Sequence, residues 1–160
     1  MAPHEGISGP HLTAAFLCEK ILTERDGVAS FIRIVDRFTI PVMPQLPPGV
    51  ELPPGVQLPA PTIQFNLVIM LKSGDLGASK HTMKVTLVRP DGIEMPSQAF
   101  SVFFNGSDDN GVAVISPMAL PKPEEGLYWF DVYFETHLIT RVPMRVFYQE
   151  MQMMQGPPNR

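Results

Sequence analysis

The sequence predicts an all-β protein, an antiparallel β-sandwich of about seven to eight strands. The first observation is the segment 124–134, in which side chains alternate so that four large residues share one face, namely Tyr128, Phe130, Val132 and Phe134. A period of two is typical of a strand with one face in a core, and aromatic residues favour a pleated surface. The second observation is a turn signal after most alternating segments, without the apolar spacing of a long helix.

A local motif within this segment favours one kind of sandwich. Gly126 follows two acidic residues, Tyr128 comes next but one, and Phe130 lies two positions further on. In immunoglobulin-like domains a tyrosine lies two positions before the second cysteine, and its hydroxyl bonds to nearby backbone. Because Phe130 occupies the place of that cysteine, we expect an immunoglobulin-like sandwich that is held together by packing alone.

The N-terminal part is predicted to form a β-hairpin. Residues 12–22 are apolar enough for a short helix or for a strand with apolar residues on both faces. The turn signal Arg25-Asp26-Gly27 is followed by an alternating segment, residues 28–40. Because a hairpin requires a strand before its turn, residues 12–22 are predicted to be a strand.

The rest of the chain predicts a series of short strands. Alternation is cleanest in residues 62–72, where the apolar positions fall on one face. Further strands are predicted at 81–88, 100–104, 112–115 and 138–147, with a tight turn at Arg89-Pro90-Asp91-Gly92 and a loop at 117–125. A small barrel is the alternative architecture, because it closes its edge strands onto one another.

The predicted organisation is one domain with three less regular parts. Residues 1–10 are a flexible lead-in, residues 11–148 form the sandwich, and residues 149–160 are a flexible tail that contains Met151, Met153 and Met154. Residues 41–61 are a long Pro-rich loop that repeats Leu-Pro-Pro-Gly-Val. Proline removes backbone donors, so this loop is predicted to be extended and polyproline-like.

Composition excludes several classes of function. The net charge of −4, with scattered Lys and Arg, argues against nucleic-acid binding and against a basic membrane-binding patch. No run reaches the roughly 20 apolar residues of a membrane helix. The single cysteine, Cys18, excludes an internal disulfide, and the N-terminus lacks a signal-peptide pattern. We therefore expect a cytoplasmic protein with neither a nucleic-acid nor a membrane partner.

Candidate chemistry in the sequence is sparse. The four histidines lack the paired spacing of metal sites, and no phosphate-binding glycine loop or Gly-x-Ser-x-Gly motif is present, so no cofactor is expected. Cys18 lies in an apolar segment, where a small buried hydrophobe is the usual role. Asp36 and Arg37 favour a cross-strand ion pair, with Glu19 or Lys20 as the partner. Asp108 and Asp109 lie in a polar turn that could bind Ca²⁺, although the same residue types simply favour turns.

Two stretches carry a resemblance to known proteins. One is the N-terminal hairpin, with Ala15-Phe16-Leu17-Cys18-Glu19-Lys20 and Ile34-Val35-Asp36-Arg37, and the other is Gly126-Leu127-Tyr128-Trp129-Phe130-Asp131-Val132 followed by Arg141-Val142-Pro143. Together they resemble small bacterial proteins classed only as a domain of unknown function. The resemblance spans residues 12–148 apart from the proline segment. It implies a cytoplasmic bacterial β-sandwich and brings no catalytic residue and no ligand.

These observations predict a non-enzymatic protein-interaction or structural module rather than an enzyme. The predicted partner-binding residues lie in the proline repeats, which present pre-ordered apolar side chains to a partner: Leu46, Pro47, Pro48, Val50, Leu52, Pro53, Pro54 and Val56. An exposed sheet edge could also form a homo-oligomer by sheet extension. The alternative is an ion-dependent binder or a small enzyme with its site in the strand-connecting loops near Asp108 and Asp109.

Overall fold

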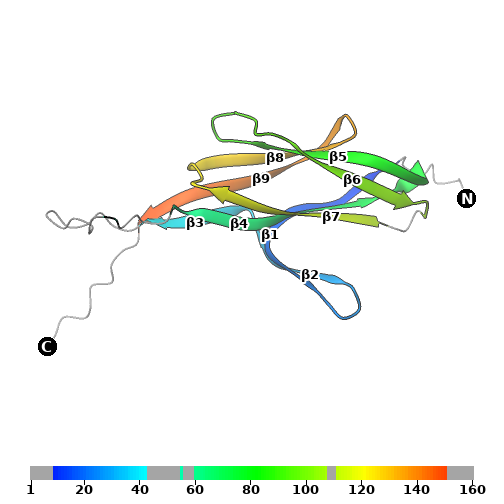
Figure 1. Cartoon of the computed structure of the whole chain (residues 1–160), viewed down its shortest axis with the longest axis horizontal. Helices are drawn as coiled ribbons and strands as arrows, with labels where there is room; N and C mark the ends of the chain where they lie inside the picture. Colours follow the sequence, from blue (N-terminus) through cyan, green and yellow to red (C-terminus); the bar gives the residue numbers. More distant parts are fainter. Residues whose placement is uncertain (1–8, 43–54, 56–59, 108–110, 151–160) are drawn as a thin grey trace, which may run out of the picture.

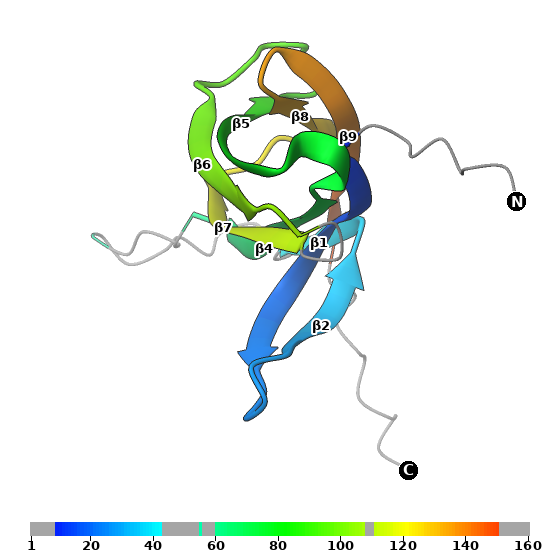
Figure 2. The same ribbon diagram turned by 90° about the vertical axis from the view of Figure 1, so that its right-hand side faces the viewer.

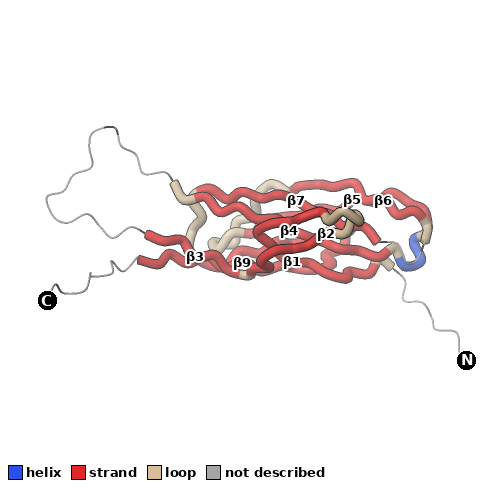
Figure 3. The backbone as a smooth tube through the Cα atoms, turned by 90° about the horizontal axis from the view of Figure 1, so that it is seen from below, coloured by secondary structure: helices blue, strands red, loops and turns tan. Residues whose placement is uncertain are grey.

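The protein is a β-sandwich of two sheets, as the sequence predicts (Figures 1 and 2). This computed structural model describes residues 9–42, 55, 60–107 and 111–150. The strands within these residues are β1 (His11–Thr23), β2 (Ala29–Val35), β3 (Arg37–Val42), β4 (Thr62–Lys72), β5 (Ala78–Val88), β6 (Gln98–Asn105), β7 (Gly111–Pro121), β8 (Gly126–Phe134) and β9 (His137–Glu150). A short 3₁₀ turn, η1 (Gly74–Leu76), joins β4 to β5 at one end of the sandwich (Figure 3).

The two sheets contain four and five strands. The first has the order β2-β1-β4-β7, and the second has the order β3-β9-β8-β5-β6. All neighbouring strands are antiparallel except β3 and β9, which are parallel. Sequence neighbours β2 and β3 therefore belong to different sheets, and the chain changes sheets between them.

The core lies between the inner faces of the sheets and follows the alternation in the sequence. In β4 all five predicted inward residues are buried: Ile63, Phe65, Leu67, Ile69 and Leu71. In β8 the predicted face is buried as well: Tyr128, Phe130, Val132 and Phe134. The rings of Phe65 and Phe130 meet edge to face across the two layers, with 5.7 Å between their centroids. Such aromatic contacts add to the free energy gained from burial.

The tyrosine motif forms the backbone contact that its spacing predicts. The Tyr128 hydroxyl accepts a hydrogen bond from the Glu124 N–H at 2.7 Å and donates one to the Glu124 carbonyl at 3.2 Å. Gly126 lies between these residues with a φ of +140°, and a Cβ there would lie 2.7 Å from Cβ of Pro90. Only glycine fits both the backbone conformation and the space.

The segment 28–40 is not the single strand that the sequence predicts. It divides into β2 and β3, and Asp36 lies at the crossing from one sheet to the other. Arg33 has a φ of +57°, a left-handed conformation that interrupts regular strand geometry within β2. Both strands alternate with a period of two, so the alternation of residues 28–40 does not show where one strand ends and the next begins.

The prediction of a short strand at 112–115 followed by a loop is also wrong. β7 continues through Pro117 to Pro121. The next residue, Lys122, donates its N–H to the Pro61 carbonyl. In β7 the backbone N–H and C=O groups of even-numbered residues therefore point toward β4, and those of odd-numbered residues point away from it. Both prolines occupy odd positions at the edge of the sheet, where the missing N–H costs no ladder hydrogen bond.

One predicted turn forms where the sequence places it, and one predicted strand begins slightly earlier. The turn at Arg89–Gly92 forms as predicted, with the Gly92 N–H donating to the Arg89 carbonyl at 2.9 Å. β9 begins one residue before the predicted strand 138–147, because His137 already pairs with Phe134. Among the described residues, no helix has the length and apolar character that crossing a membrane requires.

Candidate functional site

Most of the residues that the sequence singles out for function lie outside the described residues. This applies to the predicted partner-binding residues of the proline repeats, Leu46, Pro47, Pro48, Val50, Leu52, Pro53, Pro54 and Val56, to Asp108 and Asp109, and to the methionines of the tail. Their proposed roles stay predictions. The described residues offer three other features to examine: a projecting hairpin, an apolar opening between the sheets, and a polar network at one end of the sandwich.

The projecting hairpin, which we call the arm, comprises residues 19–35. Pairing between β1 and β4 ends at Cys18 and Asn66, whereas pairing between β1 and β2 continues to Thr23 and Ala29. Beyond Cys18, β1 therefore pairs only with β2 among the described strands. Figures 1 and 2, seen at right angles, both show the arm extending away from the two sheets.

The tip of the arm is a tight three-residue turn. The Glu24 N–H donates to the Val28 carbonyl at 2.8 Å, and the Gly27 N–H donates to the Glu24 carbonyl at 3.0 Å. Gly27 has a φ of +82°, as the third residue of such a turn requires. The Asp26 carboxylate accepts the Val28 N–H at 3.0 Å. The predicted Arg25-Asp26-Gly27 turn is therefore confirmed and held by local hydrogen bonds.

Large apolar side chains on the arm are exposed to solvent. The exposed fractions are 48% for Leu22, 60% for Val28, 42% for Ile32 and 63% for Ile34. Single exposed apolar residues are normal on a protein surface, whereas a cluster of them on one element is less common. The arm is such a cluster.

The base of the arm rests on a small apolar group outside the main core. Phe16 and Phe31 meet edge to face, with 5.0 Å between ring centroids. Cys18 and Val68 are fully buried but do not belong to the core between the sheets. Burial raises the pKa of the Cys18 thiol, so the prediction of a small buried hydrophobe at this position agrees with the structure. This group anchors the arm on the outer face of the four-stranded sheet.

Charged residues in the arm and directly after it pair differently from the sequence prediction. Glu19 pairs with Arg33 of the neighbouring strand at 3.3 Å, and both side chains remain partly exposed. Arg37 pairs with the adjacent Asp36 at 3.4 Å, rather than Asp36 or Arg37 reaching Glu19 or Lys20. The change of sheet at Asp36 carries both residues away from β1, which explains why the predicted cross-strand pair does not form.

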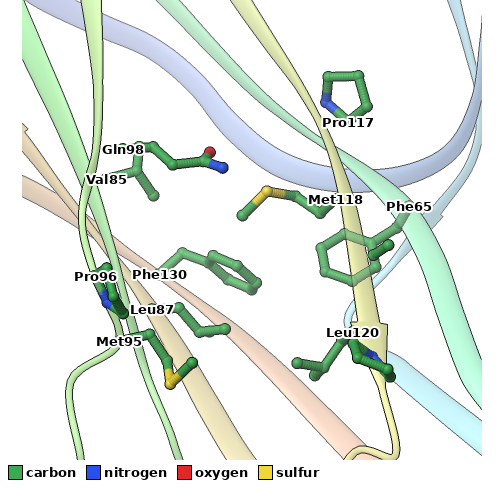
Figure 4. Close-up of a pocket in the computed structure, with 12 residues that line it drawn as sticks. Phe65, Val85, Leu87, Met95, Pro96, Gln98, Pro117, Met118, Leu120 and Phe130 are labelled. Atoms are coloured by element: carbon green, nitrogen blue, oxygen red, sulfur yellow. The ribbon is translucent and has the colours of Figure 1, made fainter.

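An apolar opening of about 270 Å³ lies between the two sheets beside β7 (Figure 4). Its floor includes the core rings of Phe65 and Phe130, and its rim includes Met95 and Met118. Gln98 supplies a polar group, but its Oε1 atom already accepts the Ser116 hydroxyl at 3.2 Å. The opening could take a small apolar group, and its lining offers little that would select one ligand over another.

A serine, a histidine and a carboxylate form a hydrogen-bonded chain at one end of the sandwich. Ser79 Oγ lies 2.7 Å from His81 Nε2, and His81 Nδ1 lies 3.0 Å from Glu135 Oε1. The sequence offers a weak signal for this chain, because Ser79 and His81 are two positions apart on one strand and so share a face. Glu135 comes from the β8–β9 turn, which no local pattern relates to them.

The surroundings of Ser79 favour a structural role for this chain. Ser79 Oγ also lies 3.1 Å from the Leu76 carbonyl and 3.4 Å from the Gly77 carbonyl. An acyl-transfer site needs hydrogen-bond donors beside its nucleophile to stabilise the oxyanion, and these neighbours are acceptors. Glu135 further accepts the Thr82 N–H at 3.1 Å. The chain therefore ties η1, β5 and the β8–β9 turn together.

Metal ligation finds no support in the part of the chain that the structure describes. No group of three or more His, Cys, Asp or Glu side chains there is arranged to hold an ion. Of the three described histidines, His11 begins β1, His81 bonds to Ser79 and Glu135, and His137 at the start of β9 lies beside Thr136.

Comparison with known proteins gives a family match. A family model described as "Family of unknown function (DUF6941)" matches residues 54–147. No curated protein matches the chain. The matched residues include β4 to β8 and most of β9, so the arm lies outside the match.

Proposed function

We propose a function for a chain that belongs to DUF6941, a family of unknown function: it is a non-enzymatic protein-interaction module whose arm contacts a protein partner. The family match begins at residue 54, so the case for the arm is made from this chain alone. The observation that carries the proposal is the exposed apolar surface of the arm.

The arm concentrates exposed apolar side chains that are elsewhere scattered. Leu22, Val28, Ile32 and Ile34 lie on one projecting hairpin, whereas Phe103, Ile115 and Leu138 lie on three different strands of the sandwich. Holding such residues in water reduces solubility, and a protein–protein contact is a common reason for their presence. The ladder between β1 and β2 and the hydrogen bonds at the tip hold the hairpin in shape. A pre-ordered surface binds with less entropic cost than a flexible one.

The sandwich supports the proposal as a rigid scaffold. Its strand order agrees with an immunoglobulin-like arrangement, in which β1, β4 and β7 correspond to strands A, B and E, and β5, β8 and β9 correspond to C, F and G. The Tyr128 hydrogen bonds to Glu124 favour the same assignment. Because one fold serves many functions, the assignment supports a scaffold and does not select a partner.

Two further elements of the proposal come from the sequence. The Leu-Pro-Pro-Gly-Val repeats, from Leu46 to Val56, are proposed as a second contact, because extended proline segments suit aromatic grooves on partners. A cytoplasmic location is proposed because the single cysteine, Cys18, is buried and unpaired, as suits a reducing compartment.

The proposal is tested by capture from a lysate of the source organism. Wild type is compared with Ile34→Asp on the arm and with Phe103→Asp on β6, two substitutions at residues that are 63% and 65% exposed. Capture of a protein that is lost only with Ile34→Asp supports the arm as the contact surface. Equal capture by all three proteins would contradict it. A fourth protein that lacks residues 45–60 reports separately on the proline repeats.

A further inference from the structure

We propose that the arm's partner is a second copy of this chain, which pairs its own β2 antiparallel to β2 about a two-fold axis through Ile32. The pairing would join two four-stranded sheets into one continuous sheet of eight strands. This inference rests on the proposed role of the arm as a contact surface and names its occupant. It follows from the edge position of β2 among the described strands, the lack of proline and lysine in β2, and the charges near the two ends of the arm.

The hydrogen bond at the tip fixes which backbone groups of β2 are free. The Glu24 N–H bonds to the Val28 carbonyl, and the pairs Leu22–Ser30 and Lys20–Ile32 follow in the same register. Hydrogen-bonded pairs recur every second residue in an antiparallel ladder. Even-numbered residues of β2 therefore bond to β1, and Ala29, Phe31 and Val35 point their N–H and C=O groups to the edge on which no described strand lies. Arg33, with its φ of +57°, departs from this regular geometry. The backbone groups of Ile32 consequently bond to β1, and Ile32 would form a non-hydrogen-bonded pair with a strand added at the open edge.

The open edge of β2 lacks the prolines found on other edges of the sandwich, and its one irregular residue is Arg33, with a φ of +57°. Proteins block edge strands with proline, lysine or covering segments. β7 carries Pro117 and Pro121, β3 carries Pro41, and β6 lies against β7 (Figure 2). β2, with the sequence ASFIRIV, contains neither proline nor lysine. An unblocked edge that also carries exposed isoleucines is suited to pairing with another strand.

Symmetry and charge select the register of this pairing. β2 runs from Ala29 to Val35, so only a two-fold axis through Ile32 pairs all of its residues. In this register Phe31 lies opposite Arg33 of the second copy, a neighbour to which a guanidinium is attracted. An axis through Arg33 would instead place two arginines opposite each other, which is unfavourable.

The ends of the arm carry complementary charges for the same register. Antiparallel pairing brings the tip of one arm, with Arg25 and Asp26, toward Asp36 and Arg37, which directly follow the base of the other arm. Each of these two pairs contains one acidic and one basic residue, so opposite charges can meet on both sides of the axis. Within residues 19–35 the charges cancel, because Glu19, Glu24 and Asp26 balance Lys20, Arg25 and Arg33. Although the whole chain has a net charge of −4, the arm that faces the second copy is neutral. The charges near the ends of the arm would therefore affect the orientation of the two arms more than the affinity between them.

The register makes a specific prediction for disulfide cross-linking. Residues opposite each other without hydrogen bonds have Cβ atoms about 4.5–5.5 Å apart, close to the separation that a disulfide spans. Ile32→Cys would place two thiols at the axis. Ile34→Cys would place its thiol opposite Ser30 of the second copy and roughly 13 Å along the strand from its own equivalent. Both residues are exposed, at 42% and 63%, which makes them a matched pair.

The experiment oxidises wild type, Ile32→Cys and Ile34→Cys with copper phenanthroline and separates the products on a non-reducing gel. Only Ile32→Cys is expected to form a covalent dimer rapidly, because Cys18 is buried and Ile34 lies away from the axis. Equal cross-linking of the two variants would overturn the register. Absence of cross-linking in both, with wild type sedimenting as a monomer at about 0.5 mM, would overturn self-pairing. In that case selective loss of lysate capture with Ile34→Asp would still support the arm as a contact for a different protein.

Discussion

At the scale of single residues, the sequence predicts the hydrogen bonds of Tyr128 but does not predict the chain of Ser79, His81 and Glu135. The spacing of Gly126 and Tyr128 indicates a backbone hydrogen bond from the tyrosine hydroxyl, and the structure contains it at Glu124. Tyr148 adds a second contact nearby, because its hydroxyl donates to the Pro123 carbonyl. The chain of Ser79, His81 and Glu135 was missed, because Glu135 reaches the other two only through the pairing of β5 with β8.

Tyr128→Phe is expected to destabilise the protein by about 1–3 kcal/mol, because it leaves the Glu124 N–H and carbonyl without their buried partner. Urea denaturation measures the change in the free energy of unfolding. Tyr133→Phe is the matched control on the same strand, since its ring keeps its contact with Lys84 at 4.5 Å. Equal stability of Tyr128→Phe and wild type would show that the hydroxyl contributes nothing net to folding.

Glu135→Gln is expected to change how stability depends on acid pH. Hydrogen bonds from the Thr82 N–H and then from His81 lower the pKa of Glu135 below its ordinary value of 4.5. A lowered pKa in the folded state means that the carboxylate stabilises the protein above pH 4.5, and that this contribution is lost as pH falls through the folded-state pKa. Melting temperatures of wild type and Glu135→Gln should therefore differ at pH 6 and converge toward pH 3. A difference that stays constant over this range would contradict the linkage.

At the scale of strands, the sequence predicts a strand well where the apolar face is buried in the core, as alternation implies. β4 and β8 have alternating residues and lie inside the sandwich, so pattern and burial agree. β2 has the same alternation, yet Ile32 and Ile34 are exposed because no described strand of the second sheet covers the arm. β7 contains two prolines, and only its position at a sheet edge explains why it remains a strand. Position within a sheet is set by distant segments, which a local pattern does not report.

Phe130→Ala tests the contribution of β8 to the core. The ring is fully buried and contacts Phe65 across the two layers, so its removal is expected to cost about 3–5 kcal/mol. This is a large part of the roughly 5–15 kcal/mol that typically stabilises a domain. Phe103→Ala on β6, where the side chain is 65% exposed, should change stability by less than about 0.5 kcal/mol. A melting temperature unaffected by Phe130→Ala would remove this ring from the core.

At the scale of the whole molecule, the order of strands in the two sheets decides which surfaces remain free. The crossing at Asp36 sends β3 to the five-stranded sheet and leaves β2 as the edge strand of the other sheet among the described residues. The sequence predicts the sandwich and its core, and it predicts that an exposed edge could support a homo-oligomer. It does not identify which edge, because that depends on where the chain changes sheets.

Sedimentation velocity over a range from about 1 µM to about 0.5 mM tests the central claim, that the arm pairs with a second copy, most directly. Wild type and Phe103→Asp should form dimers whose fraction rises with concentration. Ile32→Asp should remain a monomer throughout, because it places two carboxylates opposite each other at the axis. A wild-type protein that stays monomeric across the whole range, or an Ile32→Asp variant that dimerises as wild type does, would contradict the claim.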